Sequence, residues 1–266
     1  MKTLILKTKK KVFGSLIGRH SSAFKGNGLD FKELREYVYG EDAKKIDWKI
    51  SAKFQKPFVK EFEEDRELNI LMCILANGSL HFGSYRLKTD LIAEIVAILG
   101  FSAVKYDDKA SLIIYEKKPI FHSKPTKNIK SIPVLIEKTA SFEYLKKEYD
   151  FSFIDYLNKF KKSILFLIGD FYSHPPIKRL KHETFLIWIR DRFEENPKEL
   201  GEIELIDPLN LKKIHTFLSK ESIKEYKKKI KEKDLEFIRY LKKEKIKFTK
   251  IYTNEDPFFK LTELVK

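Results

Sequence analysis

The chain has 266 residues, 42% of them hydrophobic, and a formal net charge of +15. This length suits one large domain with a substantial core, and the 14% aromatic share excludes an intrinsically disordered chain. The one cysteine, Cys73, excludes a disulfide within the chain. Because no apolar run reaches the ~20 residues that cross a bilayer and the first residues do not form a signal peptide, we expect a cytoplasmic protein without a membrane span.

The first quarter of the chain has no regular hydrophobic period. Residues 1–17 form a short basic stretch with no clear element, and residues 18–60 mix glycines, charges and aromatic residues. We predict an irregular segment here, with short helical turns near residues 31–39 and 43–52. A segment with so little core of its own must pack on a scaffold. We therefore predict that residues 1–66 dock on a domain formed by residues 67–266.

Strand and helix patterns alternate from residue 68 onward. Continuous apolar or alternating runs predict strands at 68–75, 110–115, 164–168, 184–190, 203–206, 215–218 and 247–252. Helical spacing predicts helices at 85–102, with Ser84 as a cap, and at 129–142, 151–160 (capped by Asp150), 219–245 and 257–265. This alternation predicts an α/β fold with a mainly parallel sheet flanked by helices. Binding sites in such folds form beyond the carboxyl ends of strands, here after Leu75, Ile168 and Ile189.

One block near the start has a distinctive order of residues. It contains Gly18-Arg19-His20-Ser21, Gly26-Asn27-Gly28-Leu29-Asp30-Phe31, Leu34-Arg35-Glu36-Tyr37, Gly40-Glu41-Asp42, Ile46-Asp47-Trp48, Ser51-Ala52-Lys53 and Phe82-Gly83-Ser84. The block resembles the signature of the bacterial family known as "domain of unknown function 58". The stretch Asp191-x-x-Glu194, Pro197, Gly201, Asp207-Pro208 resembles a later part of the same family pattern.

The resemblance implies a fold and partners. The family's core is similar to the von Willebrand factor A fold, which leads us to expect that fold here with an irregular N-terminal signature segment. Family members are commonly encoded beside AAA+ ATPases of the MoxR type. The resemblance therefore implies a non-enzymatic adaptor that links such an ATPase to an unidentified client protein in maturation or chaperone-like work.

The von Willebrand A fold can also hold Mg²⁺ at the top of its sheet, in a metal-ion-dependent adhesion site. Alignment with that motif places Leu75 where the first carboxylate belongs and Asn77 and Ser79 at the two serines, while Asp170 matches the later aspartate. A hard cation needs oxygen ligands with carboxylates among them. With one carboxylate left, we expect a degenerate site without bound Mg²⁺, and no cofactor.

The signature block has two interpretations. In the structural one, Arg35 pairs with Asp42 or Asp47 while Trp48 packs on the domain. In the functional one, Arg35, Tyr37, Asp42, Asp47 and Trp48 form a docking face, because Arg, Tyr and Trp dominate interface hot spots. Asp191 and Glu194 follow a predicted strand and have the same alternatives: a partner-facing loop, or a loop held by caps and turns.

The remaining classes of function have less support. The chain has no G-x-S-x-G, H-E-x-x-H or C-x-x-C motif, and its six histidines have no ligand spacing, so we do not expect an enzyme. The basic helix at 219–245 leaves one alternative, a nucleic-acid-associated protein. Lysine far outnumbers arginine, however, and nucleic-acid recognition favours arginine, which argues against that partner.

Overall fold

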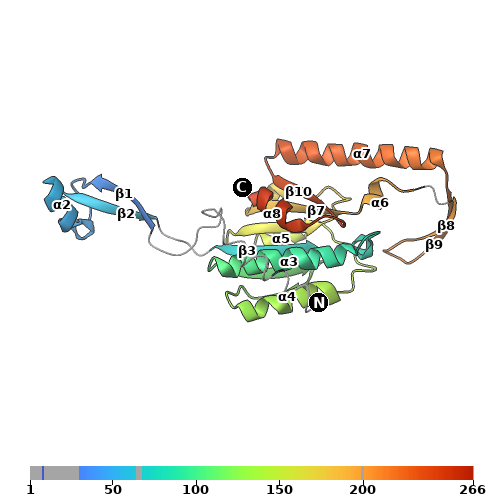
Figure 1. The fold of residues 1–266 in the computed structure, drawn as a ribbon, viewed down its shortest axis with the longest axis horizontal. Coiled ribbons are helices and arrows are strands. Elements are labelled where there is room, and N and C mark those ends of the chain that lie inside the picture. Colours follow the sequence, from blue (N-terminus) through green and yellow to red (C-terminus); the bar gives the residue numbers. More distant parts are fainter. Residues whose placement is uncertain (1–7, 9–29, 64–67, 199–200, 266) are drawn as a thin grey trace.

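The computed structural model describes residues 8, 30–63, 68–198 and 201–265. Its main body is a six-stranded sheet with the order β10-β7-β6-β3-β4-β5 (Figure 1). The strands are β3 (Asn69–Leu75), β4 (Lys109–Tyr115), β5 (Pro119–His122), β6 (Ile164–Gly169), β7 (Glu183–Arg190) and β10 (Lys247–Tyr252). All pairs are parallel except β4 with β5. The α/β class with a mainly parallel sheet is therefore confirmed.

The chain builds this sheet outward from β3 in two directions. It first adds β4 and β5 on one side, and later adds β6, β7 and β10 on the other. The order thus reverses between β3 and β6, and the loops that leave these two strands diverge at their carboxyl ends. A crevice forms at such a switch point, where open α/β sheets place their binding sites.

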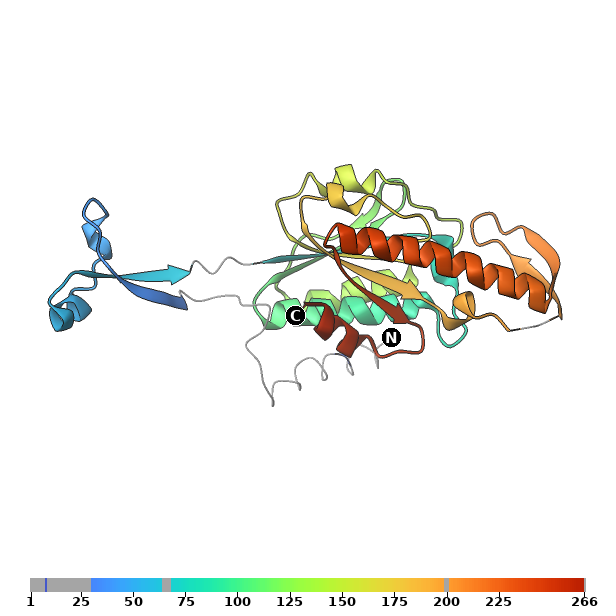
Figure 2. The ribbon, with the colours of Figure 1, turned by 90° about the horizontal axis from the view of Figure 1, so that it is seen from above.

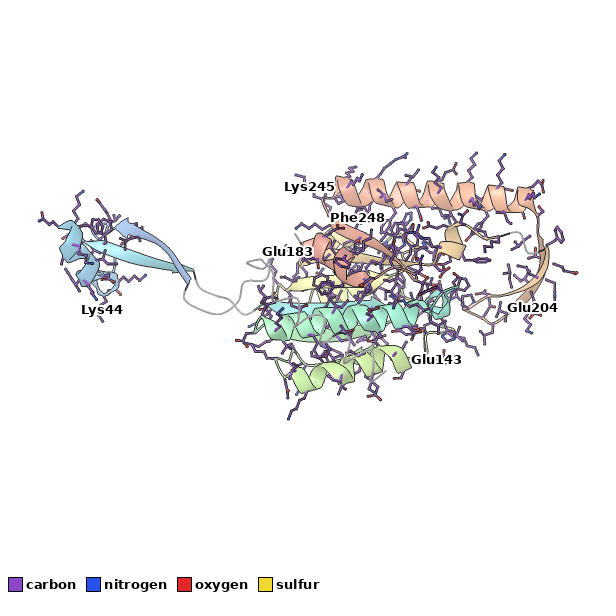
Figure 3. All side chains as sticks on the ribbon, in the orientation of Figure 1. Lys44, Glu143, Glu183, Glu204, Lys245 and Phe248 are labelled. Carbon is purple, nitrogen blue, oxygen red and sulfur yellow. The ribbon has the colours of Figure 1, made fainter. Side chains whose placement is uncertain are left out.

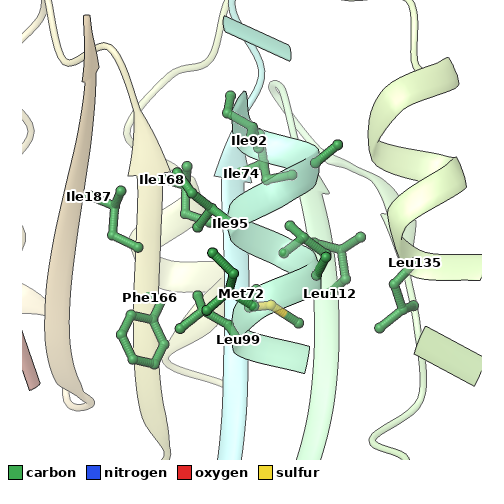
Figure 4. Packing of buried hydrophobic residues seen from close by; sticks show 14 of the residues in the cluster. Met72, Ile74, Ile92, Ile95, Leu99, Leu112, Leu135, Phe166, Ile168 and Ile187 are labelled. Carbon is green, nitrogen blue, oxygen red and sulfur yellow. The ribbon is translucent and has the colours of Figure 1, made fainter. Parts of the chain in front are cut away.

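Helices cover both faces of the sheet (Figures 1 and 2). One face packs on α3 (Lys88–Lys105), α4 (Ile132–Ser141) and α8 (Pro257–Val265), and the other on α5 (Phe153–Leu157) and α7 (Lys220–Lys243). Alternate β3 residues serve the two cores: Met72 and Ile74 lie in the α3 core (Figure 4), and Cys73 lies in the other. Burial on both faces explains why β3 reads as a continuous apolar run.

Residues 30–63 form a hairpin, which corrects the prediction of a helical turn at 31–39. Strand β1 (Asp30–Glu36) pairs antiparallel with β2 (Phe58–Glu63). Between them lie η2 (Ala43–Lys45) and α2 (Trp48–Phe54), in agreement with the helical turn predicted at 43–52. Charged residues occupy most of β1 and dilute its period-two pattern, so the strand is hard to recognise. Figure 1 draws α2 at the end of the hairpin away from the main sheet, and docking of residues 1–66 stays a prediction.

A second hairpin, β8 (Gly201–Ile206) with β9 (Lys213–Leu218), forms the two strands predicted there, but they pair with each other outside the main sheet. Its turn reaches back toward the loop after β3. The amide of Lys146 donates to the carbonyl of Pro208 at 2.8 Å. A Cβ built on Gly78 would lie 2.5 Å from that carbonyl oxygen, so only glycine fits at this approach.

Several helix ends differ from the sequence-based expectation. Helix α3 begins at Lys88 with Leu87 as its N-cap, because Ser84 makes its hydrogen bonds elsewhere. Predicted helix 151–160 shortens to α5, and Asp150 accepts from the amide of Ser152 instead of capping a longer helix. The remaining short helices are η3 (Gly78–His81), η4 (Ile129–Ser131), η5 (Ile177–Arg179) and α6 (Arg192–Glu195). Within the described ranges, no helix has the length and apolar character needed to cross a membrane.

Candidate functional site

The switch point between β3 and β6 brings together the three residues predicted as remnants of a metal site. Asn77 and Ser79 follow β3, and Asp170 follows β6. The Ser79 hydroxyl contacts both Asn77 Oδ1, at 2.8 Å, and Asp170 Oδ2, and the Ser79 amide donates to Asn77 Oδ1 at 3.0 Å. Asp170 is completely buried, and burial raises the pKa of its carboxyl group although the nearby Lys88 ammonium opposes that shift.

A buried lysine supplies the positive charge at this place. Lys88, in the first turn of α3, has no exposed side-chain surface, and its Nζ lies 2.7 Å from Glu194 Oε1. The same carboxylate oxygen accepts from the hydroxyl of Tyr172 at 3.1 Å. A buried ammonium is stable only when it is paired and hydrogen-bonded. Lys88 therefore joins the start of α3 to α6, whose residue Glu194 is more than 100 positions away.

A second ion network lies beside the first, at the ends of β7 and β10. The Arg190 side chain is 1% exposed, and its guanidinium lies 2.9 Å from Asp234 Oδ1 on α7. Lys250 on β10 contacts both Asp234, at 2.6 Å, and Glu195. Burial opposes ionisation of Glu195, but hydrogen bonding and attraction by Lys250 hold the pKa of its carboxyl group below the usual range. These contacts join α6, α7 and two strands.

Asp191 is completely buried and acts as the N-cap of α6. Its carboxylate accepts from the Ser84 amide at 2.9 Å, the Ser84 hydroxyl at 2.7 Å, the Phe193 amide at 2.8 Å and the Thr253 hydroxyl. The Glu194 carboxylate accepts from the Asp191 amide, which completes a capping box. Burial opposes ionisation, yet the Thr253 and Ser84 hydrogen bonds lower the pKa of Asp191. We call Lys88, Asp170, Arg190, Asp191 and Glu194 the carboxyl-edge cluster.

The residues at the switch point do not fit Mg²⁺. That ion prefers a near-octahedral set of oxygen ligands with carboxylates among them. Asp170 is the one carboxylate in the predicted set, while Ser79 and Asn77 are hydrogen-bonded to each other. Among the residues that the structure describes, no three or more His, Cys, Asp or Glu side chains could hold a metal ion together. Positive charge comes instead from Lys88 and Arg190, which are part of the chain.

The predicted docking residues of the signature block lie on the β1–β2 hairpin. Arg35 pairs with Glu41 at 2.9 Å, and its pairing with Asp42 or Asp47 stays a prediction. The hydroxyl of Tyr37 donates to the Glu41 carbonyl at 2.7 Å. Asp42 caps η2 and Asp47 caps α2 through backbone amides. These local bonds hold the segment that we call the hairpin tip, residues 37–56.

The hairpin tip presents large apolar side chains to solvent (Figure 3 labels Lys44 in this segment). Trp48 is 68% exposed, and its packing on the domain stays a prediction, like the docking of residues 1–66. Three neighbours are similarly exposed: Val38 (60%), Tyr39 (99%) and Phe54 (61%). Exposed aromatic residues that gather on one segment are typical of interaction sites, whereas single exposed apolar residues need no explanation.

Sequence reasoning missed Lys88, Tyr172 and Thr253. A lysine in a helix is usually read as solvated, but position 88 precedes Leu91, Ile92 and Ile95 by three, four and seven residues. That spacing places Lys88 on the inward face of α3 and is a signal that could have revealed it. Tyr172 and Thr253 carried no comparable signal, because their roles depend on loops that meet only in the fold.

The fold and the carboxyl-edge cluster define the class of protein. It is an α/β protein with a mainly parallel sheet, and oppositely charged side chains are buried together at the carboxyl ends of its strands. The family model of "Protein of unknown function DUF58" matches residues 33–235, well over half of the chain. The chain therefore belongs to the DUF58 family.

Comparison with other proteins adds relatives of equally undefined role. Uncharacterised proteins of Mycobacterium tuberculosis and Mycobacterium bovis are 33% identical over 102 residues, which is 38% of this chain. The matched stretch spans 32% of the length of those relatives. A crystal structure of the conserved hypothetical protein BatB from Bacteroides thetaiotaomicron covers 74% of this chain and 97% of its own, with a TM-score of 0.43 and 10% identity.

Proposed function

We propose that this protein is a non-enzymatic protein–protein interaction module, and that the hairpin tip is its docking face. The observation that carries the proposal is the exposure of Tyr39, Trp48 and Phe54 on one short segment. Aromatic side chains anchor interfaces because they bury a large area at a small cost in conformational entropy. Three exposed aromatic side chains that no partner covers would lower the solubility of the protein.

Local hydrogen bonds make the hairpin tip suitable for docking. Ser51 is buried in α2, where its hydroxyl donates to the Asp47 carbonyl at 2.7 Å and accepts from the Phe58 amide at 2.8 Å. The Arg35–Glu41 pair lies at the base of the same loop. A pre-organised surface loses less conformational entropy on binding, which favours affinity. This frame leaves the side chains of Tyr39 and Trp48 largely exposed to solvent.

We also propose that the protein is cytoplasmic and that its partner is an AAA+ ATPase of the MoxR type, which it would link to a client. Support comes from family membership, because DUF58 proteins are commonly encoded beside such ATPases. We further propose a von Willebrand A-like core, supported by the switch point between β3 and β6 and by the position of Asn77, Ser79 and Asp170 beside it. Asp191 and Glu194 would then position α6 instead of contacting the partner directly, since both are engaged inside the cluster.

Biolayer interferometry with a purified MoxR-type ATPase from the same genome tests this function. The full chain is immobilised, and the ATPase is supplied with ATP, with ADP or without nucleotide. We expect binding that depends on the nucleotide and that falls at least about tenfold in the Tyr39→Ala/Trp48→Ala variant. Tyr85→Ala is the matched control, because Tyr85 is 75% exposed but lies on the main body. Absence of binding in every nucleotide state would remove the ATPase proposal.

A further inference from the structure

A buried histidine lies at the amino-terminal end of the sheet, opposite the carboxyl-edge cluster. His182 directly precedes β7, and 6% of its surface is exposed. Its Nδ1 accepts a hydrogen bond from the backbone amide of Ser163 at 3.2 Å, and its Nε2 lies 2.9 Å from the carbonyl oxygen of Leu157. One imidazole ring therefore joins three segments: α5, the loop that enters β6 and the loop that enters β7.

These two contacts fix the protonation state of the ring. A backbone amide can only donate, so Nδ1 must offer a lone pair to Ser163. A carbonyl oxygen can only accept, so Nε2 must carry the proton that faces Leu157. His182 is thus held as the neutral tautomer with its proton on Nε2. A protonated ring would turn a second N–H toward the amide of Ser163, a residue that is itself 7% exposed, and that buried amide would lose its acceptor.

The surroundings of His182 also disfavour its protonation. Burial lowers the pKa of the imidazole, because the charged ring is poorly solvated there. The hydrogen bond to the Leu157 carbonyl opposes this shift, and repulsion by Lys181 adds to it. The neutral ring is therefore the form that fits the fold.

The charged groups of the neighbouring segments offer an imidazolium little compensation. Asp155 on α5 lies 3.7 Å from Arg179, and Glu244 at the end of α7 lies 2.8 Å from Lys178, so each of these acids has its own cation. Glu183 follows the histidine and is exposed. The further charged residues of the three joined segments are Lys159, Lys161, Lys162 and Lys181.

We propose that His182 is an acid-sensitive latch: mild acid protonates its ring, breaks the hydrogen bond from Ser163 and releases the loops that enter β6 and β7. Neutral His182 stabilises the fold fully above the unfolded pKa of about 6.5, and this contribution is lost as pH falls through the lowered folded pKa. Release would also reach β3, because the Ser163 hydroxyl accepts from the side-chain amide of Asn69, the first residue of that strand, at 3.2 Å. The inference is independent of docking by the hairpin tip.

A second bridge between the same loops provides a matched control. Asn158 Nδ2 donates to the Arg179 carbonyl at 2.9 Å, and Asn158 Oδ1 accepts from the Lys181 amide at 2.9 Å. An amide side chain does not titrate between about pH 5 and 8, whereas histidine does. The bridge made by Asn158 therefore persists in mild acid, beside one that does not.

Thermal unfolding of the full chain, followed by circular dichroism at about pH 7.5 and about pH 5.5, tests the proposal. His182→Gln removes the titrating ring, Asn158→Ala removes the second bridge, and His215→Gln removes a histidine whose side chain is 75% exposed. We expect the thermal midpoint of wild type to fall by at least about 2 °C more than that of His182→Gln between the two pH values. Asn158→Ala should have a lower midpoint at both pH values, and both control variants should keep the pH dependence of wild type. An equal pH dependence in His182→Gln and wild type would overturn the proposal.

Nitrogen-15 NMR of wild type tests the same latch without a substitution, in case His182→Gln does not fold. At about pH 7.5 we expect His182 to carry a proton on Nε2 and none on Nδ1. At about pH 5.5 the protection of the Ser163 amide against hydrogen exchange should fall at least about fivefold. A proton on Nδ1 at about pH 7.5, or unchanged protection of Ser163 at about pH 5.5, would overturn the proposal.

Discussion

The hairpin tip and the carboxyl-edge cluster use similar residues in opposite ways. Both contain charged side chains with aromatic neighbours, and both include residues that resemble the family pattern. In the hairpin tip the bonds are local, as between Arg35 and Glu41, and Trp48 faces solvent. In the cluster the bonds connect distant parts of the chain, as between Lys88 and Glu194, and the side chains are buried. The cluster therefore joins distant elements of the fold, and the hairpin tip is the face that we propose for docking.

The largest effect on stability is expected from Lys88→Met. The variant leaves Glu194 and Asp170 buried without the ammonium that faces them. We expect the free energy of unfolding to fall by about 3–5 kcal/mol in urea titrations. Lys242→Met, on the exposed end of α7, is the control and should change it by less than about 0.5 kcal/mol.

A double-mutant cycle sharpens that prediction. Glu194→Gln in the Lys88→Met background removes the uncompensated charge, so the double variant should be more stable than the sum of the single effects by roughly 1–3 kcal/mol. Strict additivity of the two substitutions would contradict a cluster held by charge pairing.

The wild type should also show no change in thermal midpoint with Mg²⁺ or a chelator, because the residues at the switch point do not fit that ion.

Asp191→Asn is expected to lower the free energy of unfolding by about 2–3 kcal/mol at neutral pH. An amide cannot accept all the hydrogen bonds that reach this carboxylate. The pKa of Asp191 is lowered in the fold, so its stabilisation is complete above the unfolded pKa and declines as pH falls through the folded pKa. The difference between variant and wild type should therefore shrink below about pH 4 in urea titrations across pH. A difference that stays constant down to pH 3 would be incompatible with an ionised Asp191 as the acceptor.

Gly78→Ala tests the approach of the β8–β9 turn to the loop after β3. The new Cβ would lie 2.5 Å from the Pro208 carbonyl oxygen, so one of the two loops must move. We expect a loss of about 1–3 kcal/mol in thermal or urea unfolding. Gly169→Ala is the matched control, because its new Cβ would meet Leu75 at an ordinary 3.5 Å. Equal losses in the two variants would argue against a specific contact at Gly78.

The smallest effect on stability is expected at the hairpin tip. Tyr39→Ala/Trp48→Ala removes two exposed side chains that contribute little buried area. The free energy of unfolding should therefore change by less than about 0.5 kcal/mol. The same variant should lose partner binding, as set out above. A loss of several kcal/mol would show that these aromatic residues pack in the folded protein, and would return Trp48 to a structural role.

Much of the fold could be predicted from the sequence, because burial on both faces makes strands such as β3 and β6 continuously apolar. The two hairpins were harder. Charged residues occupy five of the seven positions of β1 and break its period of two, and β5 has only four residues, so neither pattern reached the strength of a strand signal. The pairing of β8 with β9 outside the main sheet depends on a turn whose contacts are not local.

The candidate sites, like the fold, could be predicted from the sequence only in part. The resemblance to the von Willebrand A motif grouped Asp170 with Asn77 and Ser79, and the structure brings these residues together because their strands are neighbours in the sheet. The exposure of Trp48 could not be predicted, since the same motif suits a buried or an exposed aromatic. Thr253, which donates to Asp191 of the cluster, escaped prediction because its partner is more than 60 residues away.

Hydrogen–deuterium exchange of the full chain, with and without a MoxR-type ATPase in ATP, tests most directly which region meets a partner. We predict that exchange slows in the hairpin tip, residues 37–56, and stays unchanged in residues 77–88 and 190–196. Slowed exchange around Lys88 and Asp191 with an unchanged hairpin tip would contradict the account and assign docking to the carboxyl edge of the sheet.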